Sequence, residues 1–470
     1  MKNLDVYLNG YLQDNRELII NDLMELVRVP SVIGEPQPGA PFGEQTRKAL
    51  DTVSAQMMRM GQKVIIPEHG AYGYCEFGSG EKIIGLIPHL DVVPPSGKWM
   101  YDPFEPVFQD GYMISRGVSD DKGGAIGSMY ALDAIAKAGI LLKNKNRLIF
   151  LCNEEVDMEG DIDHLEQAGL TPDFSLVPDA FFPIGNGEKG YLYVKLSNSL
   201  ELKNIKYFCG GMLDEASVPI NAECVLKATD ALEAELDVLC NTNEALRFER
   251  NNGEIKVSAI GVGAHPVMPE SGVNAVWVLA NALQKVNILS EPDHMAMELI
   301  ATLTEGYTGE GMGVAYHDVE SGDLTCVCMW CEIADGKIDL RFSIKYCVTM
   351  AKQALLNMLK DTAEKYAFVL SVEKSREAHY ISPNDKRVQS LMTSYFKSCG
   401  QKPELYVHPG NTYAGILKNA VIFGNEFRAP GPFGMQRGRA HQQDEVTNID
   451  LLVQSVRVYV YAILALDEII

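Results

Sequence analysis

The sequence has few features that would place the protein on a nucleic acid or a membrane. Lys and Arg together number 41 against 63 Asp and Glu, which gives a formal net charge of −22. Because nucleic acids and anionic membranes are bound through cationic surfaces, this shortage of positive charge argues against both partners. No run of about 18 uninterrupted apolar residues occurs, so we expect no membrane-spanning helix. The amino terminus lacks the apolar stretch of a signal peptide, and we expect a cytoplasmic protein.

The sequence also lacks the cysteine pattern of a disulfide-bonded protein. Its ten cysteines are scattered, and most stand in apolar runs, which indicates reduced and buried thiols. Cys326, Cys328 and Cys331 alone are clustered. A structural zinc site needs a fourth ligand and a loop, whereas residues 324–331 have the pattern of a β-strand. We therefore expect a strand here, not a zinc site.

The length of 470 residues exceeds what one growing core accommodates, so two domains are expected. Apolar periodicity predicts alternating helices and strands in the amino-terminal part, which indicates an α/β fold. The predicted helices are 3–29, 44–60 and 123–138, and the predicted strands are 63–67, 72–77, 82–88 and 147–152.

Residues 191–383 have a different pattern, rich in strands, that predicts an inserted α+β domain. Within it we expect strands at 191–196, 254–261, 324–331 and 337–344 and helices at 272–287 and 349–366. The α/β pattern returns from residue 384, with helices at 384–398 and 447–468. The sequence thus predicts a discontinuous first domain, 1–190 with 384–470, interrupted by 191–383.

Polar residues that can bind metals follow several of the predicted strands. His89 and Asp91 come after an apolar strand, and side chains two apart on a strand point the same way. Both residue types are ligands for divalent metals such as zinc. Asp120 and Asp121 are adjacent in a glycine-flanked loop, where they would repel each other without a cation. The alternative is a helix-capping pair with a salt bridge to Lys122.

Three further segments extend this pattern. Glu154 and Glu155 follow strand 147–152, the position at which open α/β sheets place their sites, although a solvated loop is the alternative. Asp179 follows another short apolar run, and His441 lies in a polar segment near the carboxyl terminus. Two histidines and several carboxylates predict a dinuclear hydrolytic site in which one Asp bridges the metals. Two adjacent glutamates would supply one ligand and one general base.

The order His-x-Asp, Asp-Asp-Lys-Gly, Glu-Glu, Pro-Asp-Ala and a distal His resembles one dinuclear metallopeptidase family. That family includes acetylornithine deacetylase, succinyl-diaminopimelate desuccinylase, aminoacylase, carboxypeptidase G and carnosinase. The sequence looks most similar to its bacterial dipeptidase branch, typified by PepV and the manganese-dependent Sapep dipeptidases. The resemblance covers nearly the whole chain and implies a mixed-sheet catalytic domain, an inserted lid domain and two divalent metal ions. Zn and Mn are the expected metals, with Co as a further choice.

The resemblance also implies roles for individual residues. It assigns the metal ligands His89 and Asp179 to one ion, Glu155 and His441 to the other, and Asp120 as the bridge. It further implies a cis peptide after Asp120, makes Glu154 the general base, and makes Asp91 the residue that orients His89.

In the lid, His265 matches a histidine that stabilises the oxyanion of the reaction, although a lone His in a glycine-rich loop is usually structural. Arg341 matches an arginine that binds the substrate carboxylate, with a strand salt bridge as its alternative role. The cradle for the substrate end corresponds to Gly410, Asn411 and Thr412.

The sequence departs from the family pattern at four positions: Asn153, Ala216, Asn411 and Gly415. Ala216 stands where relatives have an asparagine that holds substrate, so this departure bears on the identity of the substrate. The other three replace, in order, an Asp, a Gly and an Arg that are common in the family.

The function implied is hydrolysis of small peptide substrates, namely dipeptides with a free amino terminus, by a metal-activated water. The alternatives are N-acyl-amino-acid deacylation, carboxypeptidase action, and a catalytically silent metal-dependent peptide-binding protein. Residues 191–384 are long enough for the enlarged lid of the dipeptidase branch, so we expect a monomer, with a dimer as the alternative.

Overall fold

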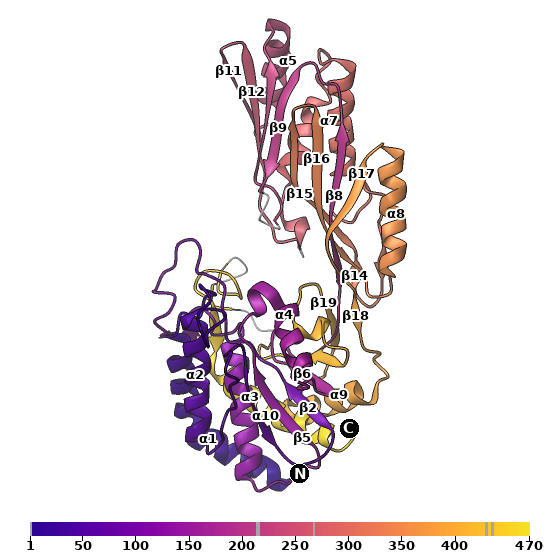
Figure 1. The fold of residues 1–470 in the computed structure, drawn as a ribbon. Coiled ribbons are helices and arrows are strands. Elements are labelled where there is room, and N and C mark those ends of the chain that lie inside the picture. The colour runs from indigo at the N-terminus through magenta and orange to yellow at the C-terminus, as the bar shows by residue number, and fades with distance from the viewer. Residues whose placement is uncertain (1, 213–216, 267, 428–430, 434–436) are drawn as a thin grey trace. The chain divides into compact units, whose positions relative to one another are not determined.

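A computed structural model describes residues 2–212, 217–266, 268–427, 431–433 and 437–470 (Figure 1). The chain forms two compact units. Unit 1 comprises Met1–Glu188 and His379–Ile470, and unit 2 comprises Lys189–Ala378. The sequence-based division had placed these two boundaries at about 190 and 384. Ala216 lies outside the described residues.

Unit 1 is built on an eight-stranded mixed sheet. Its central strands β5, β2, β6 and β20 run parallel to one another, and β1 adds an antiparallel strand at one edge. β19 pairs with β7 in parallel. The strand order is β1 (Gly73–Phe77), β5 (Lys145–Phe150), β2 (Ile83–Leu86), β6 (Phe174–Val177), β20 (Ala420–Ile422), β7 (Ile184–Glu188) and β18 (His379–Tyr380), with β19 (Leu405–His408) beside β7.

Both faces of this sheet are buried under helices. Successive strand residues point to opposite faces, so neighbours on one strand enter different cores. Leu148 and Phe150 pack into one core with five helices, whereas Ile149 packs into a second core with helix α4. The five helices are α1 (Lys2–Val27), α2 (Glu44–Arg59), α3 (Lys122–Lys137), α9 (Lys386–Cys399) and α10 (Ile449–Asp467), and α4 is Glu154–Gln167. Unit 1 is therefore a three-layer α/β structure, which confirms the predicted fold class.

Unit 2 is built on an antiparallel sheet of eight strands with helices on one face. Along β8, Leu192, Val194 and Leu196 are buried under the helices, while the residues between them are only partly buried. The strand order is β11 (Leu246–Asn251), β12 (Glu254–Ile260), β10 (Asn221–Lys227), β9 (Ile205–Gly211), β15 (Thr325–Ala334), β16 (Lys337–Tyr346), β8 (Gly190–Ser199) and β17 (Val369–Arg376). The helices are α5 (Asp230–Thr242), α6 (Ala275–Leu283), α7 (Glu291–Leu303) and α8 (Lys352–Lys365).

The structure adds helices α5 and α7 to the two helices predicted in unit 2, and it corrects two details of the assignment in unit 1. Residues 63–67 form no strand, and Ile65 makes only an isolated bridge to Tyr74 before Pro67 ends the run. Helix α4 was not predicted, because it is rich in acidic residues and buries few apolar side chains, among them Ile162 and Leu165. Its first two residues are Glu154 and Glu155, so the glutamate pair opens a helix and is not part of a solvated loop.

The cysteines follow the expectation drawn from the sequence. All ten are free thiols. Cys326, Cys328 and Cys331 lie on β15 and are buried in the core of unit 2. Burial also raises the pKa of the Cys328 thiol, which disfavours the thiolate that a zinc site requires. The cluster is therefore part of the hydrophobic core.

One helix among the described residues is long and apolar enough to cross a membrane by length and composition, namely α10. The core helix of a globular protein passes the same test, and 67% of the apolar window of α10 is buried inside the structure. α10 packs against α9 and α3 in the core of unit 1.

Asp293 provides a test of the packing of unit 2. Its fully buried carboxylate accepts hydrogen bonds from the backbone N–H groups of Lys203, Asn204 and Ile205 and from the Ser290 hydroxyl. Asp293→Ala removes the acceptor of all these groups, including the buried N–H of Ile205, so we expect a loss of about 3 kcal/mol in the free energy of unfolding. Urea denaturation measures it. Glu298→Gln, at an exposed position of the same helix, should change stability by less than about 0.5 kcal/mol. Equal effects of the two variants would contradict the assigned role.

Candidate metal centre

The predicted metal-binding residues of unit 1 lie at the carboxyl ends of parallel strands. His89 follows β2, Glu154 and Glu155 follow β5, and Asp179 follows β6. Because these strands are parallel neighbours, their carboxyl ends meet at one edge of the sheet. Asp120 stands just before α3, and it brings a fourth segment to this edge.

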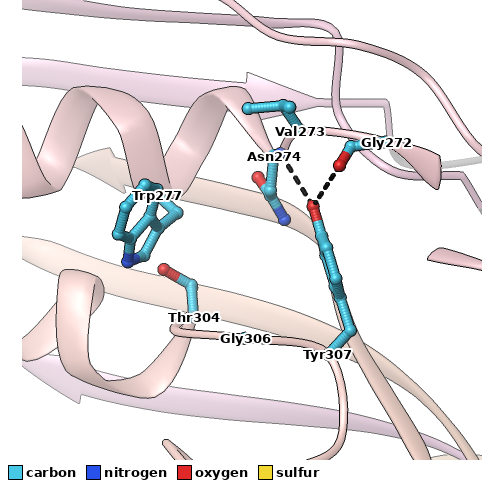
Figure 2. Close-up of a pocket in the computed structure, with 7 residues that line it drawn as sticks. All are labelled: Gly272, Val273, Asn274, Trp277, Thr304, Gly306 and Tyr307. Atoms are coloured by element: carbon cyan, nitrogen blue, oxygen red, sulfur yellow. Dashed lines mark hydrogen bonds between the residues drawn. The ribbon is translucent and has the colours of Figure 1, made fainter. Parts of the chain in front are cut away.

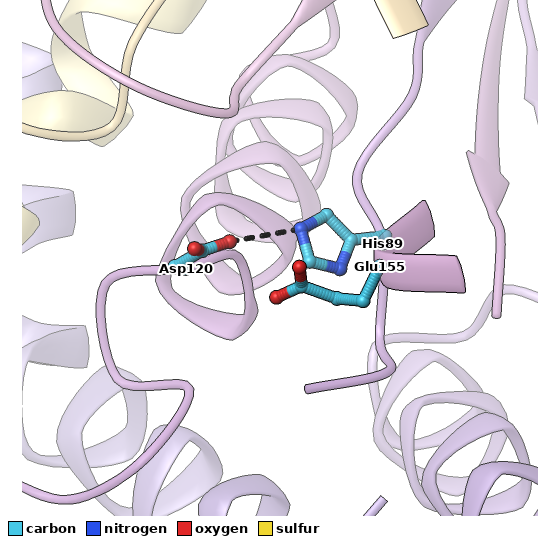
Figure 3. A group of neighbouring side chains, drawn as sticks. All are labelled: His89, Asp120 and Glu155. Carbon is cyan, nitrogen blue, oxygen red and sulfur yellow. Dashed lines mark hydrogen bonds and ion pairs between the residues drawn. The ribbon is translucent and has the colours of Figure 1, made fainter. Parts of the chain in front are cut away.

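Asp120 lies between the two histidines. Its Oδ1 is 3.0 Å from His89 Nε2, and its Oδ2 is 3.1 Å from His441 Nε2. His441 Nε2 is also 3.1 Å from Glu155 Oε2, and His89 Nε2 is 3.9 Å from Asp179 Oδ2. Figure 3 shows His89, Asp120 and Glu155 converging from different segments. The structure therefore brings together all five residues that the resemblance named as ligands.

Among the residues that the structure describes, two groups of ligand atoms are compact enough to hold a metal ion. The first group consists of His89, Asp120 and Glu155, and the second of His89, Glu154 and Asp179. Within each group the donor atoms lie within 4.8 Å of one another. His89 belongs to both. This grouping places His89 with Glu155, whereas the resemblance assigns these two residues to different ions. Because the two groups share His89, and His441 contacts Asp120 and Glu155, the five ligands and Glu154 form one continuous cluster.

Burial and mutual repulsion disfavour the ionised forms of the carboxylates in this cluster. Burial raises the pKa of Glu154, Glu155 and Asp179 above their usual values, and neighbouring carboxylates raise them further. Such a set must bind either protons or cations. Imidazole nitrogens and carboxylate oxygens are the donors that Zn, Mn and Co accept, so the residues present fit divalent metal ions.

The same carboxylates raise the pKa values of the two histidines. Burial alone would lower the pKa of His89, but hydrogen bonds to Asp120 and Asp91 raise it well above its usual value. Burial also opposes protonation of His441, yet Asp120 and Glu155 raise its pKa to about 12. For Asp120, burial would raise the pKa, but the two histidines lower it. The cluster therefore attracts positive charge at its centre.

Asp91 has a structural role that the sequence did not reveal. Its buried carboxylate accepts hydrogen bonds from the backbone N–H groups of Glu154 at 3.1 Å and Glu155 at 3.0 Å. These are free N–H groups in the first turn of α4, so Asp91 stabilises the start of that helix. His89 Nδ1 lies 3.0 Å from the Asp91 carbonyl and 3.4 Å from its carboxylate. Asp91 thus connects His89 to the glutamate pair.

The loop before α3 adopts the predicted cis peptide between Asp120 and Asp121. The alternative interpretation of this pair as a helix cap with a salt bridge is wrong. Asp121 makes no side-chain capping bond, and Lys122 Nζ donates instead to the carbonyl of Val29 at 2.7 Å. Asp121 accepts from the His89 backbone N–H, at 3.3 Å.

Several residues that support the cluster were missed from the sequence. Asn425 Nδ2 donates to the carbonyls of Ser119 and Pro178, so it ties the segment of Asp120 to that of Asp179. Its place after the short buried strand β20 is the signal that could have indicated it. Glu426 follows it, and burial raises the pKa of Glu426 to about 7. Glu445, after His441, is the most heavily hydrogen-bonded of these residues.

Two side chains in and beside the loop predicted to cradle substrate donate hydrogen bonds to buried carboxylates. Thr412 Oγ1 donates to Glu188 Oε1 at 2.5 Å, and the Tyr413 hydroxyl donates to Asp161 at 2.5 Å. A Cβ atom at Gly410 would lie 2.6 Å from the ring of His408, so a larger residue here would have to displace that ring. Asn411, in the same loop, is partly buried.

His265 and Arg341 belong to unit 2. His265 is exposed in the loop after β12, and Arg341 stands on β16. Arg341 Nη2 pairs with Glu373 Oε1 at 3.0 Å, and its guanidinium lies 5.4 Å from the centre of the Trp330 ring. The strand salt bridge considered as an alternative for Arg341 is therefore present.

Unit 2 also contains an apolar cavity of about 230 Å³ (Figure 2). It lies at the base of the loop that carries His265, where the Tyr307 hydroxyl accepts from the Asn274 N–H at 3.0 Å and donates to the Gly272 carbonyl. The lining residues are Gly272, Val273, Asn274, Trp277, Thr304, Gly306 and Tyr307. They include no carboxylate, histidine or cysteine that could bind a metal ion.

The chain is similar in sequence to known proteins over nearly its whole length. The profile of peptidase family M20/M25/M40 matches residues 85–465. The Bacillus subtilis (strain 168) protein YtjP is 30% identical over 471 residues, which cover 96% of this chain and 98% of YtjP. The Beta-Ala-Xaa dipeptidase of Lactobacillus delbrueckii subsp. lactis is 27% identical over 481 residues, 99% of each chain.

Solved structures share the fold. Human carnosine dipeptidase 1 matches with a TM-score of 0.58 and 16% identity over 99% of both chains. The di-peptidase Dug1p of Saccharomyces cerevisiae matches with a TM-score of 0.58 and 12% identity over 98% of both chains. The family match and the whole-length relatives confirm the resemblance found in the sequence: the chain belongs to peptidase family M20/M25/M40.

Proposed function

We propose that this protein is a dinuclear metallo-dipeptidase that hydrolyses dipeptides with a free amino terminus. The observation that carries the proposal is the position of Asp120, with one carboxylate oxygen facing each of two histidines. A carboxylate so placed suits a ligand shared by two ions. The whole-length similarity to a protein named a Beta-Ala-Xaa dipeptidase supports the substrate class.

In this proposal His89, Asp120 and Asp179 would hold one ion, and Asp120, Glu155 and His441 would hold the other. Zn and Mn suit these donors best, with Co as a further choice. When bound, the ions supply Lewis acidity and acidify a nucleophilic water.

Glu154 serves as the general base. It is buried beside the ligands, and Asp91 fixes its backbone at the start of α4. Its carboxylate takes the proton of the attacking water and passes it to the leaving amine nitrogen. A buried carboxylate with a raised pKa holds that proton well enough to return it.

Unit 2 serves as the lid. His265 donates to the developing oxyanion, and Arg341 binds the carboxylate of the dipeptide, exchanging Glu373 for substrate. Gly410, Asn411 and Thr412 cradle the substrate end. We also propose that the enzyme acts as a monomer, because the lid is a complete eight-stranded unit with its own core.

Glu154→Gln tests the base. We expect kcat to fall by about 10³-fold, because general acid–base catalysis contributes on that order. Metal content should stay at the wild-type value. Steady-state hydrolysis of a dipeptide and elemental analysis of the same sample measure both quantities. Glu166→Gln, exposed on the same helix, should keep wild-type kcat. Full activity of Glu154→Gln with its metals bound would remove Glu154 from the mechanism.

Metal removal tests the centre and the substrate class together. The chelated protein should lose hydrolysis and melt at a lower temperature, because each ion at 100 times its Kd adds about 2.7 kcal/mol of stability. Protein reloaded separately with Zn or Mn is then assayed on dipeptides, N-acetyl amino acids and a tripeptide.

Activity restricted to dipeptides with free amino termini supports the proposal. Cleavage of the acyl amino acids would keep the metal centre and replace the dipeptidase by a deacylase. Metal binding without cleavage of any substrate would replace the enzyme by a peptide-binding protein.

Arg341→Ala tests the carboxylate anchor. We expect KM to rise by about 10- to 100-fold with a smaller change in kcat, since a charge-assisted hydrogen bond pair contributes about 1.5–3 kcal/mol. Glu373→Gln is the matched control, because it breaks the same ion pair from the other side. Its KM should be unchanged or lower. If both variants lose stability alike and neither changes KM, Arg341 serves only as a strand ion pair.

A further inference from the structure

Glu445 is a buried carboxylate that joins two segments of the candidate metal centre, and an inference about it rests on the proposed metal binding. Its side chain is fully buried. Oε1 accepts hydrogen bonds from the Ser119 N–H at 2.9 Å, the Ser119 hydroxyl at 3.2 Å and the Asp120 N–H at 3.1 Å. Oε2 accepts from Arg116 Nη1 at 2.6 Å and the Gly117 N–H at 3.1 Å.

The backbone of Glu445 makes a second connection between the same segments. Its carbonyl accepts from the Ser115 N–H at 3.0 Å, and the strand that follows it, β21 (Val446–Asn448), pairs with β4 (Tyr112–Ile114). Glu445 stands four residues after His441 and holds the backbone of Asp120 directly. The one residue thus fixes both the loop that presents Asp120 and the segment that presents His441, whose side chains lie 3.1 Å apart.

Residues 441–444, which precede Glu445, are held in an uncommon conformation. His441 and Asp444 both have positive φ angles, 63° and 52°, which are uncommon for residues other than glycine. Asp444 is anchored too, since its Oδ1 accepts from the Met100 N–H at 2.8 Å and its Oδ2 from the guanidinium of Arg437. The His441 segment therefore depends on the side chains that follow it for its shape.

The donors around Glu445 include the guanidinium of Arg116. Arg116 is itself 1% exposed, and its guanidinium lies 5.1 Å from the centre of the Trp99 ring. The charge of Arg116 balances that of Glu445, so this carboxylate adds no uncompensated negative charge to the cluster. A glutamine would replace one acceptor oxygen by an NH₂ group and turn it toward other donors.

We propose that Glu445 is a positioning residue that sets the separation of Asp120 and His441. In doing so it sets the affinity for the ion that these two residues share with Glu155. Outer hydrogen bonds of this kind typically change metal affinity by about 10- to 100-fold. Glu445 touches neither ion nor substrate, so its effect appears in metal binding before it appears in chemistry.

A purely structural carboxylate supplies the matched control. Asp467 is also buried in unit 1, and it accepts hydrogen bonds from the backbone N–H groups of Lys143 and Asn144, both at 2.8 Å. None of its partners carries a residue of the metal cluster. Asp467→Asn and Glu445→Gln therefore remove the same kind of contact at different places.

The experiment titrates the metal-stripped full-length proteins with Zn²⁺ by calorimetry and with Co²⁺ by visible absorption. Wild type and Asp467→Asn should bind two equivalents with the same affinities. Glu445→Gln should keep one ion and bind the other about 10- to 100-fold more weakly, with a changed Co²⁺ spectrum for that ion only. Melting temperatures of the metal-free proteins measure the structural cost of each substitution.

Two results would overturn the inference: wild-type affinity for both ions in Glu445→Gln, or an equal loss of affinity in Asp467→Asn at equal loss of melting temperature. If Glu445→Gln does not fold, Glu445→Asp replaces it, since it keeps the charge but shortens the reach to Asp120, and the same weakening of one ion is expected. Failure of wild type to bind two ions would instead overturn the proposed function.

Discussion

The mutual repulsion of buried carboxylates at one edge of the sheet is the constraint on which the rest of this structure depends. Glu154, Glu155, Asp120 and Asp179 meet in a space from which water is largely excluded. Like charges at such distances cannot all remain ionised without a counter-charge. Two histidines supply part of it, and the donor set suits divalent cations for the remainder.

The protein holds this unfavourable arrangement in place with backbone contacts. Asp91 fixes the start of α4, Asn425 ties two of the ligand segments together, and Glu445 holds a third. Asn425 and Glu445 bond mainly to backbone groups, whereas Asp91 contacts both the backbone of the glutamate pair and the side chain of His89. The ligands therefore remain available to bind an ion while the segments that carry them are fixed.

The sequence is informative where chemistry is local. His89 and Asp120 stand in short motifs beside apolar runs, so their residue types and spacing are enough to indicate metal binding. The sequence also predicts the parallel sheet, because continuous apolar strands such as 147–152 are typical of it. It does not indicate Asp91 as the anchor of α4 or Glu445 as the anchor of Asp120. Those partners lie 63 and 325 residues away along the chain, and their acceptors bind backbone N–H groups, which every sequence contains.

Unit 2 leaves and rejoins unit 1 at neighbouring positions. The last residue before it, Glu188, lies opposite the first residue after it, His379, in adjacent antiparallel strands. An insertion whose two ends are neighbours can be lengthened, shortened or exchanged without breaking the sheet that receives it. Unit 2 can therefore be remodelled without disturbing the sheet whose strand ends carry the metal-binding residues.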